Sequence, residues 1–476
     1  MRNRSGNLLQ WMTWLGLALL VAGPNIEAQS GKQKTEEFSL GRAVNFALEH
    51  YPAVRVAIER VAAAHGGVGL AHTQYLPTSS LLWQSNRATA NNIFGLLLPQ
   101  PVLPPISGPV LANTSNRSAW GSGAGALASW EPFDFGYRRA EVNVARAGER
   151  VAGAEAELTR LDVATAVSNA FFSLLAAQQI TQAAGANVTR REVFDKSVHV
   201  LVTNGLRPGA DASRADAELA LARNQMIEAE TAEGVSRAAL AEILGMAGTK
   251  VEIDSGPLLG SAPEQGLAPV PPAAHPAATA LEAHVSQEKA REHALSRSYV
   301  PHFFSQAAIS ARGSGANANG IFAGGLNGLG LERMNWALGV TVTFPLMDYF
   351  SIRDQKRIEA ANQRAEEARY EQELQDLSGQ IAEAQVKLEG ARRVAENTPI
   401  ELKAAREGET QSRTRYESGL ATIVEVAESE SLLVQAEIDQ GLARLNVWRR
   451  LEGVAAAQGN LQPFLELVRA QSKGGD

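Results

Sequence analysis

The second half of the chain repeats the first, and this duplication constrains the fold more than any other feature of the sequence. Tyr75-Leu76-Pro77 corresponds to Tyr299-Val300-Pro301 at an offset of 224 residues. Further on, Phe133-Asp134-Phe135 corresponds to Met347-Asp348-Tyr349 at an offset of 214. The change of offset indicates an insertion of ten residues in the first half. We therefore expect two homologous repeats that fold in the same way.

The repeats divide the chain into segments. Residues 1–28 are typical of a secretion signal, because Arg2 and Arg4 precede a short apolar run. A single membrane-spanning anchor is the alternative interpretation, although the run is short for a span. After it we expect the first repeat at 29–261, a Pro-rich linker at 262–276, the second repeat at 277–460 and a C-terminal tail at 461–476.

Each repeat is predicted to contain a helix, a β-hairpin, a very long helix, a turn and a further helix. The long helices run from Arg138 to about Val202 and from Arg353 to about Tyr416. A helix of roughly 65 residues reaches about 100 Å and must pack against others to be stable in water. The second one carries a heptad seam formed by Leu374, Leu377, Ile381, Ala384, Leu388, Ala391 and Ala395.

A proline interrupts this second long helix. Pro399 lies 214 residues after Gly185, so both long helices carry a weak point at the same place. Thr398-Pro399-Ile400-Glu401 also has the pattern of a capping box with proline at the first helical position. We therefore expect a break or kink near residue 398.

The two hairpins, at about 79–130 and 303–344, alternate apolar residues with small or polar ones, which is typical of strands. Trp120 and Trp130 share one face, ten residues or about 33 Å apart. With Trp336 and Phe344 of the second hairpin, they predict the aromatic girdle of a membrane barrel in outer-membrane lipid. A soluble sheet packed on a core is the alternative for either hairpin alone.

Two hairpins supply four strands, and four strands cannot close a barrel. Known single-chain barrels have at least about eight strands, and open strand edges are not tolerated in lipid. The chain is therefore expected to oligomerise, although this argument leaves the number of copies open. The loops at about 87–118 and 312–333 would face outside the cell.

The composition excludes several classes of protein. The 476 residues carry a formal charge of −7 and no basic stripe, so we expect no nucleic acid partner. The chain has no cysteine, which excludes disulfides, thiolate metal sites and a lipid-bearing N-terminal cysteine. Its eight histidines lack close metal-ligand spacing, and no phosphate-binding loop or nucleophile–base constellation is visible. We therefore expect no metal site, no cofactor and no enzyme activity.

Several short motifs, taken together and in order, resemble the outer-membrane efflux family of which TolC is the founding member. They are Leu40 to Pro52, Pro132-Phe133-Asp134-Phe135-Gly136, Asn204-Gly205-Leu206, Phe344-Pro345-Leu346-Met347-Asp348 and Tyr416-Glu417-Ser418-Gly419-Leu420. The resemblance covers about 38–460. It implies a mainly α fold with a β-barrel part: a homotrimer whose 12-stranded barrel lies in the outer membrane and whose 12-helix tunnel extends through the periplasm.

The resemblance also implies partners and sites. The partners are a periplasmic adaptor and an inner-membrane transporter, which would supply the energy. The turns at Gly205-Leu206 and Gly419-Leu420 match the family's tip turns, which receive the adaptor. Residues at the positions of the family's periplasmic gate and constriction are Asp211, Tyr416, Glu425 and Glu428.

One position departs from the family's pattern. The founding member has a gate arginine two residues after the glycine of the second turn, where this chain has Ala421. Arg207 holds the equivalent place in the first repeat and is the possible substitute. For Glu425 and Glu428, an ordinary helix start is the alternative, because acidic residues also favour that end of a helix.

The sequence thus predicts the exit duct of a tripartite efflux or type I secretion system. The alternative is an elongated periplasmic coiled-coil adaptor or a surface fibre without channel activity, in which the hairpins would form a soluble sheet. The transported substrate is left open, since the tunnel lining and the loops are generic.

Overall fold

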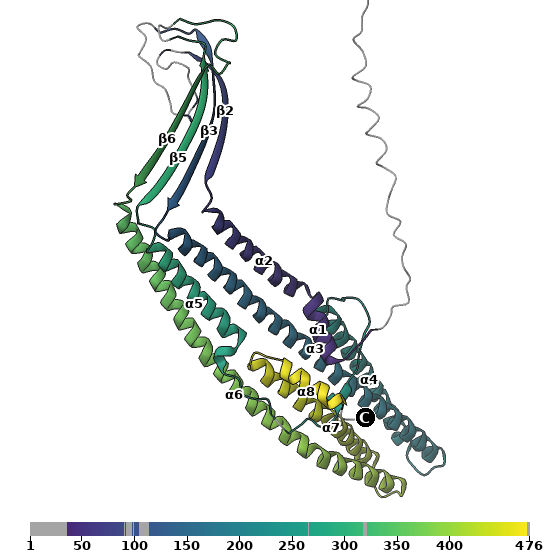
Figure 1. Cartoon of the computed structure of the whole chain (residues 1–476). Coiled ribbons are helices and arrows are strands. Elements are labelled where there is room, and N and C mark those ends of the chain that lie inside the picture. Colours follow the sequence, from purple (N-terminus) through teal and green to yellow (C-terminus); the bar gives the residue numbers. More distant parts are fainter. Residues whose placement is uncertain are drawn as a thin grey trace, which may run out of the picture.

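The computed structural model describes residues 36–89, 91, 98, 100–103, 114–264, 266–317 and 321–473. The chain is elongated, with a β-sheet at one end and long helices that run away from it (Figure 1). The predicted secretion signal at 1–28 lies outside the described residues, and so does much of the loop at 87–118.

From α2 and α5 onward the two repeats have the same order of elements, as the sequence predicts, and α1 is an additional helix of the first repeat. The first contains α1 (Leu40–His50), α2 (Pro52–Thr73), β2 (Thr78–Thr89), β3 (Ser118–Phe133), α3 (Tyr137–Thr203) and α4 (Gly209–Ile243). The second contains α5 (Pro276–Leu295), β5 (His302–Ser314), β6 (Arg333–Thr343), α6 (Asp348–Glu417) and α7 (Ile423–Ala457). The long helices α3 and α6, of 67 and 70 residues, confirm the two very long helices.

Shorter elements join the repeats and close the chain. They are β1 (Glu36–Phe38), β4 (Val251–Ile253), the 3₁₀ turns η1 (Gly256–Leu259) and η2 (Pro272–Ala274), and α8 (Gln462–Lys473). β1 pairs in parallel with β4, which ties the start of the described chain to the segment between the repeats. The expected C-terminal tail is largely the helix α8, which buries Phe464 fully and most of Leu465.

The four strands of the two hairpins form one antiparallel sheet in the order β2-β3-β5-β6. The contact between the repeats is the pairing of β3 with β5. The register aligns Leu81, Ala126 and Ile309 across the sheet, with Trp336 next to them on β6. Partners in antiparallel strands project to the same side, so this row lies on one apolar face. That face is uncovered in the chain: Leu81 is 86% exposed and Trp336 80% exposed.

The main hydrophobic core lies in the helical part, around the middle of α3. Its largest fully buried members are Trp448, Phe38, Phe171, Phe172 and Phe464. The indole of Trp448 donates a hydrogen bond to the carbonyl of Gly260 at 3.2 Å, which fastens the inter-repeat segment to α7. Within the described residues, α3 is the one helix long and apolar enough to cross a membrane, but half of its apolar window is buried against other helices. We assign it to this core.

The seam of α6 is confirmed. Leu377 and Leu388 are buried, and the other five predicted positions are half-buried. Leu388, Ala391 and Ala395 contact the main core, which explains why alanine occupies the later positions: α6 approaches its neighbours closely there.

The expected break near residue 398 is wrong, because α6 continues through Pro399 without interruption. A proline inside a helix leaves the carbonyl four residues earlier without its N–H partner. Here that carbonyl belongs to Ala395, and it accepts the hydroxyl of the buried Thr398 at 3.5 Å. Packing also holds the helix on both sides, through Ala395 before the proline and through Ala405 after it. Tertiary contacts therefore override the local stop signal.

A substitution of Pro399 tests the continuity of α6. Because a helix-interior proline costs up to about 3 kcal/mol relative to alanine, Pro399→Ala should raise the free energy of unfolding. Denaturant titration followed by circular dichroism measures it. The neighbouring exposed Ile400→Ala is the control and should change stability by less than about 0.5 kcal/mol. A Pro399→Ala protein less stable than the parent would show that a break is needed.

Candidate functional site

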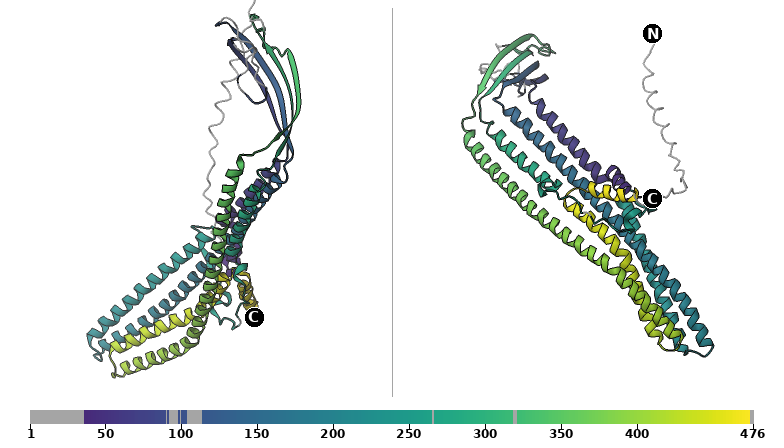
Figure 2. Two further views of the ribbon diagram at one scale, coloured as in Figure 1. Left: turned by 90° about the vertical axis from the view of Figure 1, so that its left-hand side faces the viewer. Right: turned by 60° about the horizontal axis from the view of Figure 1, so that its bottom comes forward.

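The turns between the paired helices lie together at the end furthest from the sheet (Figure 2). Gly205 and Gly419 adopt φ values of 73° and 79°, in the left-handed region that favours glycine. Leu206 N–H donates to the Leu201 carbonyl at 2.9 Å, and Leu420 N–H donates to the Arg415 carbonyl at 2.8 Å. Both turns are thus the same helix-ending motif, as the repeat predicts.

The two leucines that follow these glycines are strongly exposed apolar residues of the tip. Leu206 is 68% exposed and Leu420 is 70% exposed. The helix-ending motif needs the glycine but does not need a large apolar side chain in water. A pair of exposed leucines at equivalent positions is therefore free to contact a partner.

Two of the predicted gate residues meet just inside the tip. The hydroxyl of Tyr416, at the end of α6, donates a hydrogen bond to Asp211 Oδ2 at 2.9 Å. Asp211 lies in the first turn of α4, so this bond joins the two helix pairs. Tyr416 is fully buried and packs against Phe194 of α3, with ring centroids 5.6 Å apart.

Arg207 completes this cluster, which we call the tip lock: Arg207, Asp211 and Tyr416. The guanidinium of Arg207 lies over the ring of Tyr416, with Cζ 4.1 Å from the centroid, and donates a hydrogen bond to the Tyr416 carbonyl. Burial, followed by the bond to Asp211, raises the pKa of Tyr416 to about 12. The phenol therefore stays protonated at neutral pH and can donate to Asp211. The place of the family's gate arginine, Ala421, is buried among the apolar residues beside Tyr416.

The other two predicted gate residues are not part of the tip lock. Glu425 forms a capping box at the start of α7: its backbone N–H donates to Thr422 Oγ1 at 3.3 Å, and its carboxylate accepts the Thr422 N–H at 3.2 Å. Glu428 lies on the next turn. Both side chains are exposed in the single chain. Glu425 therefore has a structural role at the helix start, and both carboxylates remain open to solvent.

A buried layer of charges crosses all four tip helices next to the lock, on its side away from the tip. Arg191 of α3 contacts Glu430 of α7 at 2.8 Å, and Arg413 of α6 contacts the same carboxylate at 2.9 Å. Glu218 of α4 and Glu409 of α6 flank the two arginines at 3.8 and 3.1 Å. The side chains of Arg191 and Glu430 are only 5% and 1% exposed. Glu430 is thus held between two guanidinium groups that come from different helix pairs.

The sequence analysis did not predict this charged layer, although the sequences of α3 and α7 contain a pattern that indicates it. Arg191 occupies a seam of α3 whose other members are buried, with the spacings three and four: Ala184, Asn187, Phe194 and Val198. Glu430 sits in the same way between Val426 and Leu433 of α7. A charge inside an otherwise apolar seam predicts a buried partner of opposite sign.

The predicted girdle residues all belong to the sheet end. Trp130 is 47% exposed, and its indole donates to the Tyr75 carbonyl at 3.1 Å. Trp120 is half-buried beneath the guanidinium of Arg87, 5.6 Å from the ring. Trp336 and Phe344, on and just after β6, are 80% and 60% exposed. Trp130, with a polar contact and an exposed face, fits the interface between lipid and water, whereas the register places Trp336 level with Ala126, between Trp120 and Trp130.

Comparison with known proteins agrees with this geometry. Residues 43–246 and 280–460 match the family described as Outer membrane efflux protein. The chain is 25% identical to Protein CyaE of Bordetella pertussis, over 96% of each chain. Its fold is similar to that of CusC, with a TM-score of 0.73, 14% identity and coverage of 88% of this chain and 92% of the other. The fold is also similar to that of the open state of the Neisseria gonorrhoeae MtrE outer-membrane channel. The TM-score is 0.70, with 19% identity and coverage of 88% of this chain and 89% of the other.

The chain therefore belongs to the outer membrane efflux protein family. It is an outer-membrane channel protein with a helical tunnel in the periplasm, and it is not an enzyme. TolC-like channels of this family form trimers. The adaptor or surface-fibre alternative is set aside by this membership. The two family matches also coincide with the two repeats that the offsets in the sequence predict.

The charged layer gives a test of stability. In Glu430→Ala, Arg191 and Arg413 lose the buried carboxylate between them, and removing one partner of a buried pair costs about 3–5 kcal/mol. Denaturant unfolding followed by circular dichroism measures the loss. Glu428→Ala, two residues away and exposed, is the matched control and should change stability by less than about 0.5 kcal/mol. Equal effects of the two substitutions would contradict the proposed role of the layer.

Proposed function

We propose that three copies of the chain form the exit duct of a tripartite efflux or type I secretion system, closed at rest by the tip lock. The observation that carries this proposal is the set of contacts by which Arg207 and Asp211 of one helix pair hold Tyr416 of the other. Contacts between two pairs of helices at a tunnel's end resist their separation. Opening the tunnel would require them to break.

A homotrimer is supported by the sheet, which needs further copies to close, and by the family, whose TolC-like channels form trimers. Each chain contributes four strands, and both outer strands, β2 and β6, have one edge unpaired within the chain. Three copies joined β2 to β6 give a 12-stranded barrel, in which no edge meets lipid. The apolar face with Leu81, Trp83 and Trp336 would then face the membrane.

Glu425 and Glu428 are proposed as the constriction of this duct. In a trimer each exposed carboxylate would be present three times around the axis. Rings of carboxylates favour cations over anions in a pore. The capping box of Glu425 is compatible with this role, since it fixes the carboxylate at the helix start.

The docking site for a periplasmic adaptor is proposed at the two tip turns. Gly205 and Gly419 shape the turns, and the exposed Leu206 and Leu420 offer apolar contacts. An inner-membrane transporter would supply the energy, and the channel itself would be passive. Membership of the outer membrane efflux protein family supports export as the class of function.

The lock is tested by conductance of the purified trimer in planar bilayers. Tyr416→Phe removes the hydroxyl that donates to Asp211, and loss of one hydrogen bond of about 1 kcal/mol shifts the closed-to-open ratio about fivefold toward open. Arg207→Ala should add to this effect. Tyr370→Phe, on the same helix far from the tip, is the control and should conduct like the parent. A Tyr416→Phe, Arg207→Ala channel with unchanged open probability would refute the lock.

Docking is tested by cross-linking in cells between a photoreactive residue at Ser418 and the adaptor. The double variant Leu206→Glu, Leu420→Glu should lower the yield of the cross-linked channel–adaptor product at least about tenfold, because charges replace the exposed apolar contacts. Leu221→Glu on α4, similarly exposed at 52%, should leave it unchanged. If both proteins reach the membrane as trimers and cross-link equally, the leucines do not dock the adaptor.

A further inference from the structure

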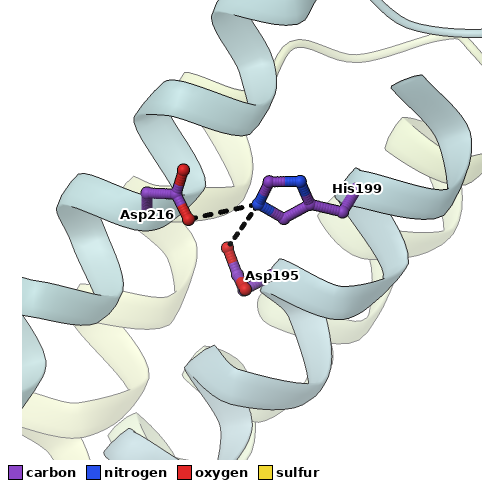
Figure 3. A group of neighbouring side chains, drawn as sticks. All are labelled: Asp195, His199 and Asp216. Atoms are coloured by element: carbon purple, nitrogen blue, oxygen red, sulfur yellow. Dashed lines mark hydrogen bonds and ion pairs between the residues drawn. The ribbon is translucent and has the colours of Figure 1, made fainter. Parts of the chain in front are cut away.

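A histidine near the tip lies between two aspartates that come from two helices (Figure 3). Asp195 and His199 are one turn apart on α3, and Asp216 faces them from α4. All three residues of the cluster belong to one chain. His199 lies six residues before the turn glycine Gly205. None of its members belongs to the tip lock or to the charged layer.

The spacing of the three groups fits a metal ion. His199 Nε2 lies 3.1 Å from Asp216 Oδ1 and 3.6 Å from Asp195 Oδ1. One ligand atom from each residue lies within 4.8 Å of the others. Around a tetrahedral zinc ion, neighbouring ligand atoms are about 3.4 Å apart, given metal–ligand bonds of about 2.1 Å. Small side-chain movements would therefore bring all three groups onto one ion.

One carboxylate oxygen of the cluster, Asp195 Oδ1, is buried and accepts no hydrogen bond, and the imidazole of His199 lies beside it at ion-pair distance. A carboxylate oxygen withdrawn from water without a donor is unfavourable, and a bound cation would satisfy it. His199 and Asp216 are 48% and 61% exposed, so an ion could reach the site and keep water in its remaining positions.

We propose that Asp195, His199 and Asp216 bind a divalent transition-metal ion of the zinc class. An imidazole nitrogen with two carboxylates suits zinc and its neighbours, whereas calcium and magnesium prefer sites made only of oxygen. The ion fastens α3 to α4 just above the first tip turn. It would thereby stiffen the helix pair that ends at Gly205 and Leu206.

The rest of the described chain offers a contrast. Three other histidines each meet one carboxylate: His65 with Glu149 at 2.8 Å, His284 with Glu155 at 3.3 Å, and His302 with Glu131 at 2.7 Å. Within the described residues, only the cluster around His199 gathers three ligand groups. The expectation of no metal site rested on spacing along the sequence, which does not bring Asp216 of α4 next to Asp195 and His199 of α3.

The test is zinc binding to the full chain, purified without a histidine tag and stripped with a chelator, by isothermal titration calorimetry. The hydrogen bond to Asp216 and the charge of Asp195 raise the pKa of His199, so protons compete with the metal and the titration is made at about pH 8. The parent should bind one more zinc ion per chain than His199→Ala. In Asp216→Asn the affinity of that site should fall on the order of 100-fold.

His65→Ala is the matched control, because it removes an exposed histidine that has a single carboxylate partner. This variant should bind zinc with the stoichiometry and affinity of the parent. Calcium in place of zinc should not bind at this site in either protein. Zinc should also raise the melting temperature of the parent and of His65→Ala, but not of His199→Ala. Equal zinc stoichiometry and affinity in the parent and His199→Ala would overturn the proposal, leaving only an ion pair at this position. Neither outcome depends on conductance or on the adaptor.

Discussion

A four-stranded sheet with two open edges cannot rest in lipid, because each unpaired backbone N–H or C=O group there costs several kcal/mol. The sheet of this chain has an apolar face with no cover from its own helices and two outer strands, β2 and β6, that each lack one neighbour. The rest of the proposed assembly depends on this constraint. Closure with further copies removes the edges, and the helices that continue each hairpin are then gathered into a tunnel.

At the other end of the molecule, the same duplication gives two helix pairs, which are joined near the tip. Each repeat ends in its own helix pair, α3 with α4 and α6 with α7. Polar contacts join the two pairs: Glu430 lies between Arg191 and Arg413, Arg190 pairs with Glu437, and Tyr416 is held by Asp211 and Arg207. Arg191 and Glu430 are almost fully buried and their pair is costly to break, whereas Arg207 and Asp211, which hold Tyr416, are only half-buried. This difference suits a stable pivot above a gate that opens.

Much of this architecture could be predicted from the sequence, because it depends on periodicity. The alternation in the hairpins and the seam of α6 follow from which residues must face away from water, and the structure confirms both. The break expected at Pro399 was wrong. The free-energy cost of the proline is visible in the local sequence, whereas the tertiary packing of Ala395 and Ala405 that offsets it is not. Arg207, which the sequence suggested in place of the missing gate arginine, contacts Tyr416, and its role in a gate is part of the proposal. The pairing of Arg191 with Glu430 depends on two helices 239 residues apart in sequence, which no local pattern specifies.

The most direct test of the account is a disulfide scan between the outer strands, which is feasible because the chain has no cysteine. Ser80 of β2 is replaced by cysteine together with Ala337, Gly339 or Thr341 of β6, one at a time. Within one sheet β2 and β6 are separated by two strands, or about 14 Å, which is too far for a disulfide. Closure of the barrel predicts covalent dimers and trimers, and no larger species, for at least one pair after oxidation in the membrane. If every pair yields only monomers, the outer strands do not meet, and the barrel proposed for this chain is wrong.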